Sequence, residues 1–176
     1  MMNLCIKEGE IIMTQPIPIP IPIPMKQSRT IQTHLVLPPD INTMETIFGG
    51  KVLSYIDEIA AITAMKHCKN TVVTASIDSV DFLSSARVGD CLELESVVSS
   101  TGRTSMEIYV RVHSTNLLTG ETKLTTESFL TFVAIDETGK PTPVPGIVAE
   151  TEDEIRLYES GPARREHRKQ RLQMKH

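Results

Sequence analysis

The sequence contains no tryptophan, and only 4% of its 176 residues are aromatic. It therefore lacks the stacked aromatic rings with which many proteins bind single-stranded nucleic acid. The formal net charge of -4 gives no general attraction to phosphate backbones or to anionic lipid surfaces. No apolar run reaches the roughly 20 residues that a membrane-spanning helix needs. We expect neither nucleic acid nor a membrane as a partner.

Cysteine and histidine are also sparse. The three cysteines are Cys5, Cys68 and Cys91, and the five histidines are His34, His67, His113, His167 and His176. The cysteines show no CxxC spacing, so we expect reduced thiols in a cytoplasmic protein. The histidines have no spacing typical of a metal site, so we expect no metal and no cofactor. The hydrophobic content of 40% suits one globular domain with a real core.

Proline and isoleucine alternate strictly from Pro16 to Pro24. Proline fixes the backbone and removes every second amide donor, so this stretch can form neither a helix nor a central strand. An extended, polyproline-like conformation is what such a sequence favours. We predict that residues 1–28 form an extended or disordered arm outside the folded domain.

The first twelve residues suggest an origin outside the coding sequence. Residues 7–10 are what a purine-rich ribosome-binding sequence encodes when it is read in frame, and Met13 follows at a suitable distance. We predict that translation starts at Met13 and that residues 1–12 are not translated. A signal peptide is the alternative, but charged side chains at positions 7, 8 and 10 interrupt its apolar core.

The rest of the chain is organised around residues 42–65, which begin as a loop and become a helix at Gly49-Gly50. Nearly every residue of the helical part is apolar, which is typical of a buried helix. Helical spacing surrounds Asp57 with leucine and alanine, so its carboxylate should face small apolar neighbours. A carboxylate is seldom buried unless it is paired or used in chemistry. Asp57 is therefore either a structural acid or a catalytic one.

Asn42, Phe48-Gly49-Gly50 and Tyr55-Ile56-Asp57-Glu58 together resemble the signature of bacterial acyl-CoA thioesterases of the hotdog superfamily. Within that superfamily they are most similar to the cytosolic acyl-CoA hydrolase branch. The resemblance implies an α+β hotdog fold, in which an antiparallel sheet wraps a long central helix. It also implies hydrolysis of acyl-CoA to a free acid and coenzyme A. In this branch the asparagine and the aspartate have the same spacing as Asn42 and Asp57.

Alternating apolar and polar residues predict strands on both sides of the central helix. The predicted strands are residues 30–37, 72–83, 91–98, 106–113 and 123–135. Within residues 72–83 the apolar phase changes, which predicts a bulge near Asp78-Ser79. One helix followed by long antiparallel strands is an α+β pattern, and we assign residues 29–146 to this domain.

Residues 147–176 are predicted to form a C-terminal helical tail. Thr151 and Glu154 have the spacing of a capping box, which opens a helix. Gly161-Pro162 is predicted to interrupt that helix after about Ser160. Residues 164–169 are basic and predicted to be helical. They form either a solvated helix face or a source of cations for a phosphorylated ligand.

Thioester hydrolysis needs an activated water or nucleophile and a group that polarises the carbonyl. Asp57 can act as general base or as direct nucleophile, and the sequence does not choose between them. The backbone N–H of Gly50, with that of Gly49, can serve as an oxyanion donor at the start of the helix. The Asn42 amide can orient a water or the carbonyl. Each also has a structural reading: a tight turn for the glycines and a self-bonded loop for Asn42.

The resemblance further places coenzyme A along the sheet edge, with its nucleotide near the turn of residues 102–105. The candidate contacts for coenzyme A and the acyl chain are Gly49, Thr74, Ser76, Gly102, Arg103, Thr104, Ser105 and Lys140. Of these, Arg103 and Lys140 are candidates for the phosphates, and Thr74 and Ser76 for the acyl or pantetheine path opposite the helix. In the family the asparagine and aspartate meet across a dimer interface, and three dimers associate. We therefore expect a homodimer that assembles into a homohexamer.

Two other functions occur on the same fold. A hotdog hydratase uses a histidine with a nearby acid in the helix region, but the first histidine after Asp57 is His67, at the end of the helix. A non-catalytic acyl-CoA sensor joins the fold to a DNA-binding module, and no helix-turn-helix pattern precedes Arg29. Such a sensor would not need Asp57. Thioester hydrolysis is the function that we predict.

Overall fold

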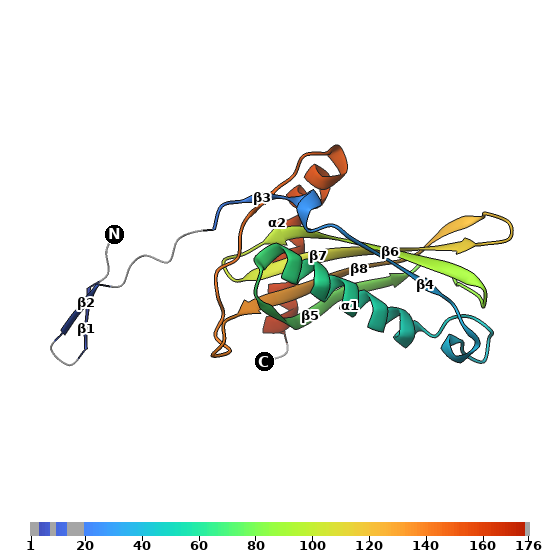
Figure 1. The fold of residues 1–176 in the computed structure, drawn as a ribbon, viewed down its shortest axis with the longest axis horizontal. Coiled ribbons are helices and arrows are strands. Elements are labelled where there is room, and N and C mark those ends of the chain that lie inside the picture. The colour runs from blue at the N-terminus through green and yellow to red at the C-terminus, as the bar shows by residue number, and fades with distance from the viewer. Residues whose placement is uncertain (1–3, 8–9, 14–19, 175–176) are drawn as a thin grey trace.

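One long helix lies in the concave face of an antiparallel sheet in the computed structural model, which describes residues 4–7, 10–13 and 20–174 (Figure 1). The helix is α1 (Gly49–Cys68), and the strand order of the sheet is β4-β6-β7-β8-β5. The strands are β4 (Thr30–Leu35), β5 (Thr71–Phe82), β6 (Asp90–Thr101), β7 (Ser105–Asn116) and β8 (Thr122–Ile135). The predicted α+β hotdog fold is thus confirmed.

The smaller elements are β1 (Leu4–Lys7), β2 (Glu10–Met13), β3 (Ile23–Pro24), β9 (Ile147–Val148) and the 3-10 turns Met25–Gln27 and Pro38–Asp40. Strand β3 pairs in parallel with β9, and Met25 and Ser28 are fully buried. Residues 20–28 therefore belong to the folded body, because pairing with β9 and burial of Met25 anchor them. Before them, β1 and β2 pair in antiparallel orientation, so an extended or disordered arm does not describe residues 4–7 and 10–13. Residues 14–19 lie outside the described part of the chain, and a translation start at Met13 stays a prediction.

The buried face of α1 packs on the inner face of the sheet. The contributing side chains include Val52, Ile56, Ile59, Ala60 and Ala64 from the helix and Leu94, Ile108, Leu130 and Phe132 from the strands. The opposite face of α1 is not covered within one chain, since Met65 is 44% exposed. A helix buried all round is therefore wrong for the single chain, because one sheet covers only one helix face. None of the described helices is long and apolar enough to cross a membrane.

A bulge in β5 changes the face to which its side chains point. Thr74 is opposite Phe132 of β8, which is buried in the core against α1. Ser76 is opposite Thr131, the next residue of β8, which faces outward. The register shift between Thr74 and Ser76 inserts one extra residue and so moves Ser76 to the outer face. The prediction that Ser76 lies opposite the helix is wrong, because this bulge was not foreseen.

A second register shift lies between Ile77 and Ser79. This is the bulge that the sequence predicted near Asp78-Ser79. Asp78 is its extra residue, and the Asp78 carboxylate accepts a hydrogen bond from the Thr131 hydroxyl at 2.7 Å on the outer face. The two bulges together place Ser76 and Asp78 on the same side of the sheet.

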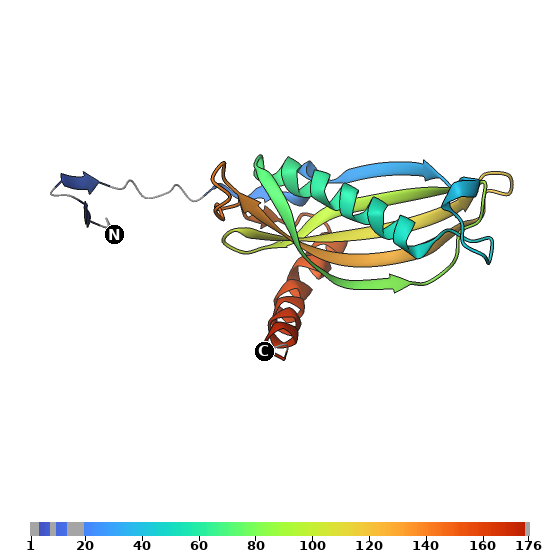
Figure 2. The ribbon, with the colours of Figure 1, turned by 90° about the horizontal axis from the view of Figure 1, so that it is seen from below.

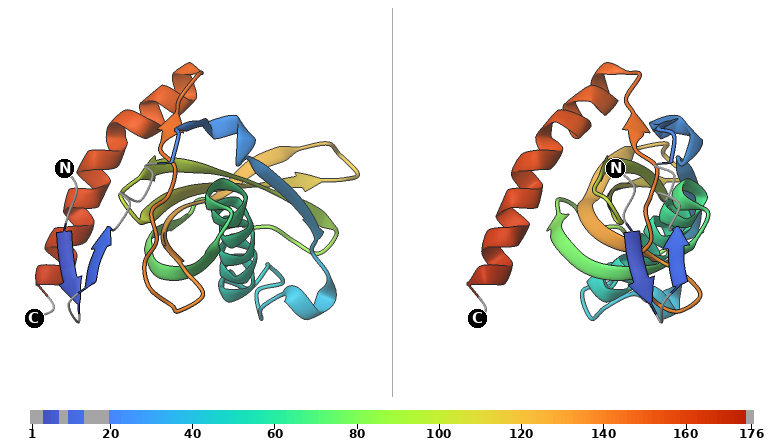
Figure 3. Two further views of the ribbon diagram at one scale, coloured as in Figure 1. Left: turned by 60° about the vertical axis from the view of Figure 1, so that its left-hand side comes forward. Right: turned by 90° about the vertical axis from the view of Figure 1, so that its left-hand side faces the viewer.

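Helix α2 (Glu152–Gln173) crosses the outer face of the sheet, on the side opposite α1 (Figures 2 and 3). Its first turn is closed by the predicted capping box. The Thr151 hydroxyl accepts a hydrogen bond from the Glu154 N–H at 3.3 Å, and the Glu154 carboxylate accepts one from the Thr151 N–H at 3.2 Å.

Helix α2 continues through Pro162, so the predicted interruption at Gly161-Pro162 is wrong. Contacts with the sheet hold the helix on both sides of the proline. Gly161 is buried against Ser100 of β6, where a Cβ would lie 2.9 Å from the Ser100 Cβ. One turn later, Arg164 forms an ion pair with Glu107 at 2.7 Å. Packing on the sheet offsets the backbone hydrogen bond that proline cannot donate.

The arginines beyond Pro162 do not form a solvated face, which corrects the first of the two predictions for this segment. Arg168 and Arg171 both form ion pairs with Asp78, at 3.1 Å and 2.8 Å. Together with the Arg164–Glu107 pair, they supply the cations for two acids on the outer face of the sheet. Partly buried acids are retained only when they are paired, and this explains the basic pattern.

Candidate active site

The Thr74 hydroxyl donates a hydrogen bond to Oδ1 of Asp57 at 3.0 Å. Asp57 lies in the third turn of α1 and Thr74 near the start of β5, so this bond joins the central helix to the edge strand beside it. Asp57 is half-buried rather than sealed in the core. The bond fixes the orientation of a carboxylate that solvent and substrate can still approach.

The sequence placed Thr74 among the residues of the acyl path and gave it no role beside Asp57. The helix-to-strand reversal after Cys68 predicts that β5 returns alongside α1. It does not tell which residues of β5 face the helix, because the bulge after Thr74 sets that phase. The contact with Asp57 was therefore missed.

Gly49 and Gly50 form the first turn of α1, directly after the N-terminal cap residue Phe48. The first N–H groups of a helix have no partner within it and are available to an anion. Neither glycine has a positive φ, so the tight-turn reading does not explain them. Lack of space for a side chain explains both glycines. A Cβ on Gly50 would lie 2.7 Å from the Phe48 ring, and a Cβ on Gly49 would lie 3.3 Å from the Phe82 ring.

A largely apolar cavity of about 400 Å³ adjoins this helix start. It is lined by Ile47, Gly49, Val52, Phe82, Leu83, Ser84, Ser85 and Thr125. The lining combines aliphatic and aromatic side chains with three hydroxyl groups, and ligand sites in proteins are of this general size.

Asn42 holds its own loop within one chain. Its side-chain oxygen accepts a hydrogen bond from the Met44 N–H at 2.8 Å, and its amide nitrogen donates to the Thr46 hydroxyl at 3.1 Å. Among the described residues no hydrogen bond joins Asn42 to Asp57. Within a single chain, Asn42 therefore has the structural role that the sequence offered, in which it holds its own loop. Asn42 and Asp57 are not bonded to each other in the single chain.

The turn of residues 102–105 lies between β6 and β7, closed by a bond from the Gly102 N–H to the Ser105 carbonyl at 2.7 Å. The Thr104 carbonyl accepts from the Ala134 N–H at 3.0 Å, which holds this turn beside the end of β8. Lys140 lies in the exposed turn that follows β8, and Arg103 is also exposed. Both cations are therefore at one end of the sheet, but contact with coenzyme A stays a prediction.

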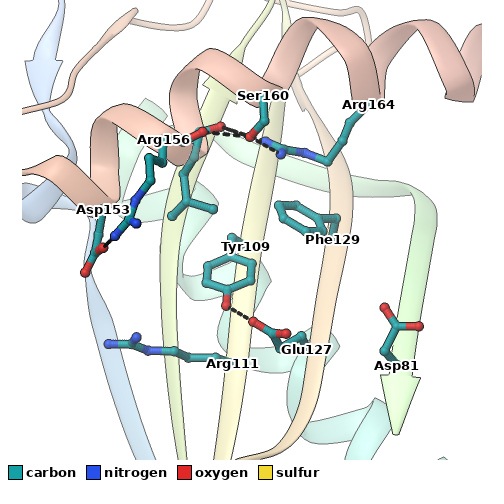
Figure 4. A pocket seen from close by; sticks show the side chains of 10 residues that line it. Asp81, Tyr109, Arg111, Glu127, Phe129, Asp153, Arg156, Ser160 and Arg164 are labelled. Carbon is teal, nitrogen blue, oxygen red and sulfur yellow. Dashed lines mark hydrogen bonds and ion pairs between the residues drawn. The ribbon is translucent and has the colours of Figure 1, made fainter. Parts of the chain in front are cut away.

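A separate cavity of about 440 Å³ lies between α2 and the outer face of the sheet (Figure 4). Its polar groups largely bind one another: the Tyr109 hydroxyl donates to Glu127, and Arg156 pairs with Asp153. Burial and the bond to Glu127 raise the pKa of Tyr109 well above its ordinary value. Because the sheet separates this cavity from Asp57 and Thr74, it does not serve their chemistry.

Among the residues that the structure describes, no three side chains of histidine, cysteine, aspartate or glutamate are grouped so that they could hold a metal ion.

Comparison with known proteins agrees with this fold. Residues 44–121 match the thioesterase superfamily. The chain is 50% identical over 146 residues to YkhA of Bacillus subtilis, named an uncharacterized acyl-CoA thioester hydrolase, with 83% of this chain and 85% of that protein covered. It is 35% identical over 160 residues to the cytosolic acyl coenzyme A thioester hydrolase of Rattus norvegicus. That match covers 90% of this chain but only 42% of the rat protein, so the chain spans less than half of its length.

Solved structures give the same result. A hexameric acyl-CoA thioesterase crystallised without ligand is 70% identical, with a TM-score of 0.85 and coverage of 86% of this chain and 98% of that one. An acyl-CoA hydrolase of Staphylococcus aureus, solved with butyryl coenzyme A and coenzyme A, is 44% identical, with a TM-score of 0.83 and coverage of 88% and 95%. The chain belongs to the thioesterase superfamily, and these relatives are acyl-CoA thioester hydrolases within it.

Three further structures are alanine variants of the Staphylococcus aureus enzyme, at an asparagine, an aspartate and a threonine. In that enzyme the asparagine precedes the aspartate by fifteen positions, and the aspartate precedes the threonine by seventeen. Asn42, Asp57 and Thr74 have the same two separations.

Proposed function

We propose that the protein hydrolyses acyl-CoA thioesters to a free acid and coenzyme A, with Asp57 as the base or nucleophile. The observation that carries this proposal is the Asp57–Thr74 hydrogen bond, which orients a half-buried carboxylate in the third turn of α1. The names of the relatives and the matching spacing of Asn42, Asp57 and Thr74 support it.

As a general base, Asp57 takes a proton from a water whose oxygen attacks the thioester carbonyl carbon. The carbonyl oxygen becomes an oxyanion, to which the Gly50 N–H donates at the helix start. The carbon–sulfur bond then breaks, and the thiolate of coenzyme A takes the proton from Asp57. As a nucleophile, the carboxylate would instead attack the carbonyl carbon and expel the thiolate of coenzyme A as the carbon–sulfur bond breaks; water then hydrolyses the resulting anhydride to the free acid and the Asp57 carboxylate, and the thiolate takes up the proton released. In both routes the Thr74 hydroxyl holds the Asp57 carboxylate in place.

The third group, Asn42, comes in this proposal from a second copy of the chain. Within one chain Asn42 is bonded to its own loop and makes no hydrogen bond to Asp57. Strand β5 is an edge strand, and its apolar residues remain open: Val73 is 44% exposed and Ile77 is 41% exposed. A long exposed edge of this kind favours pairing with another strand. Pairing of two β5 strands forms a dimer and brings Asn42 of one chain toward Asp57 of its partner.

Dimers then assemble in threes into a hexamer. The hexameric thioesterase described above supports this assembly, as does a hexameric thioesterase of Yersinia pestis that is 32% identical, with a TM-score of 0.62. Coenzyme A is expected at the turn of residues 102–105, with Arg103 and Lys140 as phosphate partners, and no further cofactor is needed. We place the protein in the cytoplasm, as the names of the cytosolic relatives suggest.

Hydrolysis of short, medium and long saturated acyl-CoAs, followed by thiol release, tests the proposal. We expect turnover with at least one chain length and its loss in Asp57→Asn, which keeps the shape of the side chain. Binding of acyl-CoA without any thiol release would instead support the non-catalytic sensor.

A further inference from the structure

The two bulges of β5 connect the site at Asp57 to helix α2 on the far side of the sheet. Thr74 precedes the first bulge and faces α1, while Ser76 follows it and faces α2. A shift of the bulge past Thr74 would turn the Thr74 side chain away from Asp57, because one position of slip exchanges the two faces of a strand. The place of the bulge is therefore a condition for the Asp57–Thr74 bond.

Asp78 is the centre of the polar cluster that holds the bulged segment. One carboxylate oxygen accepts from the Ser76 hydroxyl at 2.6 Å and from Arg171 at 2.8 Å. The other accepts from the Thr131 hydroxyl at 2.7 Å and from Arg168 at 3.1 Å. The Asp78 side chain is only 14% exposed. Four donors on one carboxylate, two of them charged, give this segment a single preferred geometry.

Arg171 also binds the backbone of the bulge. One guanidinium nitrogen donates to the carbonyl oxygen of Asp78 at 2.9 Å, and the other donates to the Ser76 hydroxyl at 2.7 Å. An extra residue in a strand disrupts the ladder locally, so its backbone groups need other partners. The planar fork of arginine can span such a carbonyl, a hydroxyl and a carboxylate at once.

We propose that Arg168 and Arg171 are positioning residues for thioester hydrolysis, because their contacts with Asp78 and Ser76 fix the β5 bulges that keep Thr74 directed at Asp57. The inference rests on the proposed function. It assigns α2 a role in the reaction although α2 lies on the opposite face of the sheet and touches no reacting group.

Kinetics of Arg171→Ala and Arg168→Ala test this proposal, with hydrolysis of short, medium and long saturated acyl-CoAs as the assay. We expect kcat to fall about tenfold or more with little change in KM, since small displacements of catalytic groups cost rate rather than binding. Arg156→Ala is the matched control on the same helix: its side chain is 75% exposed and pairs only with Asp153 among the described residues. The control should keep the full kcat.

A double-mutant cycle separates positioning from general loss of stability. In a Thr74→Ala background, Arg171→Ala should cause little further loss, because the group that it positions is already absent. Additive losses of kcat would overturn the inference. Full activity of Thr74→Ala alone would instead count against the proposed site. Failure of the positioning role and failure of the proposed function therefore give different results.

Ser76→Ala keeps the test decisive if the arginine variants unfold, because it removes one hydroxyl and leaves the arginines in place. We expect a lower kcat at unchanged KM and an unchanged midpoint of thermal unfolding. An unchanged kcat, or an increase in KM alone, would overturn the role of the cluster. An increase in KM alone would indicate that Ser76 contacts the substrate, as the sequence predicted.

Discussion

Thr74 and Asp57 are seventeen positions apart and meet where β5 runs alongside α1, with the threonine as donor and the carboxylate as acceptor. In the proposed mechanism this bond defines which side of α1 takes part in the reaction. It lies next to the open edge of the sheet, where a second copy of the chain can complete the site.

Replacing Asp57 with asparagine should reduce kcat by roughly a hundredfold or more, the usual contribution of a positioned acid–base group. The change preserves the shape of the side chain, so inhibition by coenzyme A should be nearly unchanged. Thiol release measures the rate, and coenzyme A titration measures the binding. Near-normal turnover would remove Asp57 from the reaction.

Mixing the inactive Asn42→Ala and Asp57→Ala chains should restore part of the activity. A mixed dimer contains one site with both residues intact and one site with neither. Labelled chains and energy transfer establish that subunits exchange. If exchange is complete and activity stays absent, the site is not shared between copies.

Light scattering at micromolar concentration should give the mass of a hexamer or, on dilution, of a dimer. Ile77→Lys places a charge on the exposed apolar part of β5 and should shift the mass toward the monomer, with loss of hydrolysis. Leu118→Lys, on the exposed turn between β7 and β8, is the control and should change neither. A fully active monomer would contradict both the shared site and the assembly.

Gly161→Ala should lower the stability of the protein even though alanine is the better helix former. Alanine gains about 1 kcal/mol over glycine within a helix. Its Cβ would, however, lie 2.9 Å from the Ser100 Cβ, and overpacking of this kind costs about 1–3 kcal/mol. Urea unfolding measures the difference. Adding Ser100→Gly removes the opposing carbon and should recover part of the loss, whereas no recovery would show that the contact is not the cause.

Stability should decrease in mild acid because of His67. This side chain is buried in the last turn of α1, with Nε2 2.9 Å from the Pro145 carbonyl oxygen. Burial lowers the pKa of His67 from its ordinary value of 6.5, and the bond to Pro145 opposes this only in part. The neutral form is thus favoured in the folded state. The stabilisation of the fold by neutral His67 is fully present above pH 6.5, the pKa of an ordinary histidine. It is lost as the pH falls below that value toward the lower pKa that His67 has in the folded state.

Calorimetry from about pH 7 to about pH 5 tests this sign. The midpoint of unfolding should fall for the wild type and fall less for His67→Gln, which cannot be protonated in this range. An equal fall in both proteins would assign the effect to other groups.

The sequence was sufficient for the order of the central helix and the five strands of the main sheet, because periodic apolar residues and turn signals mark each of them; it did not predict β1, β2, β3 or β9. It was sufficient for Asn42 and Asp57 as candidates, because their spacing is local to one stretch. It failed at Ser76, since the apolar residues at positions 73, 75 and 77 keep one phase across the first bulge, whereas the second bulge is marked by a change of phase. It failed at Pro162, because a sheet contact at Gly161 overrides a local helix breaker. The sequence also did not show which acids pair with the C-terminal arginines, because Asp78 and Glu107 are distant from them in the chain.

The order in which the chain is synthesised gives these arginines another consequence. Asp78 and Glu107 are in strands that leave the ribosome well before Arg164, Arg168 and Arg171. All five strands of the main sheet can therefore associate while both acids still lack their cations, and unpaired charges disfavour burial. Docking of α2 then completes the folding of the single chain, and it pairs Asp78 and Glu107 with their arginines. A chain that stops before Arg164 lacks these three arginines, so Asp78 and Glu107 keep their charges without those partners.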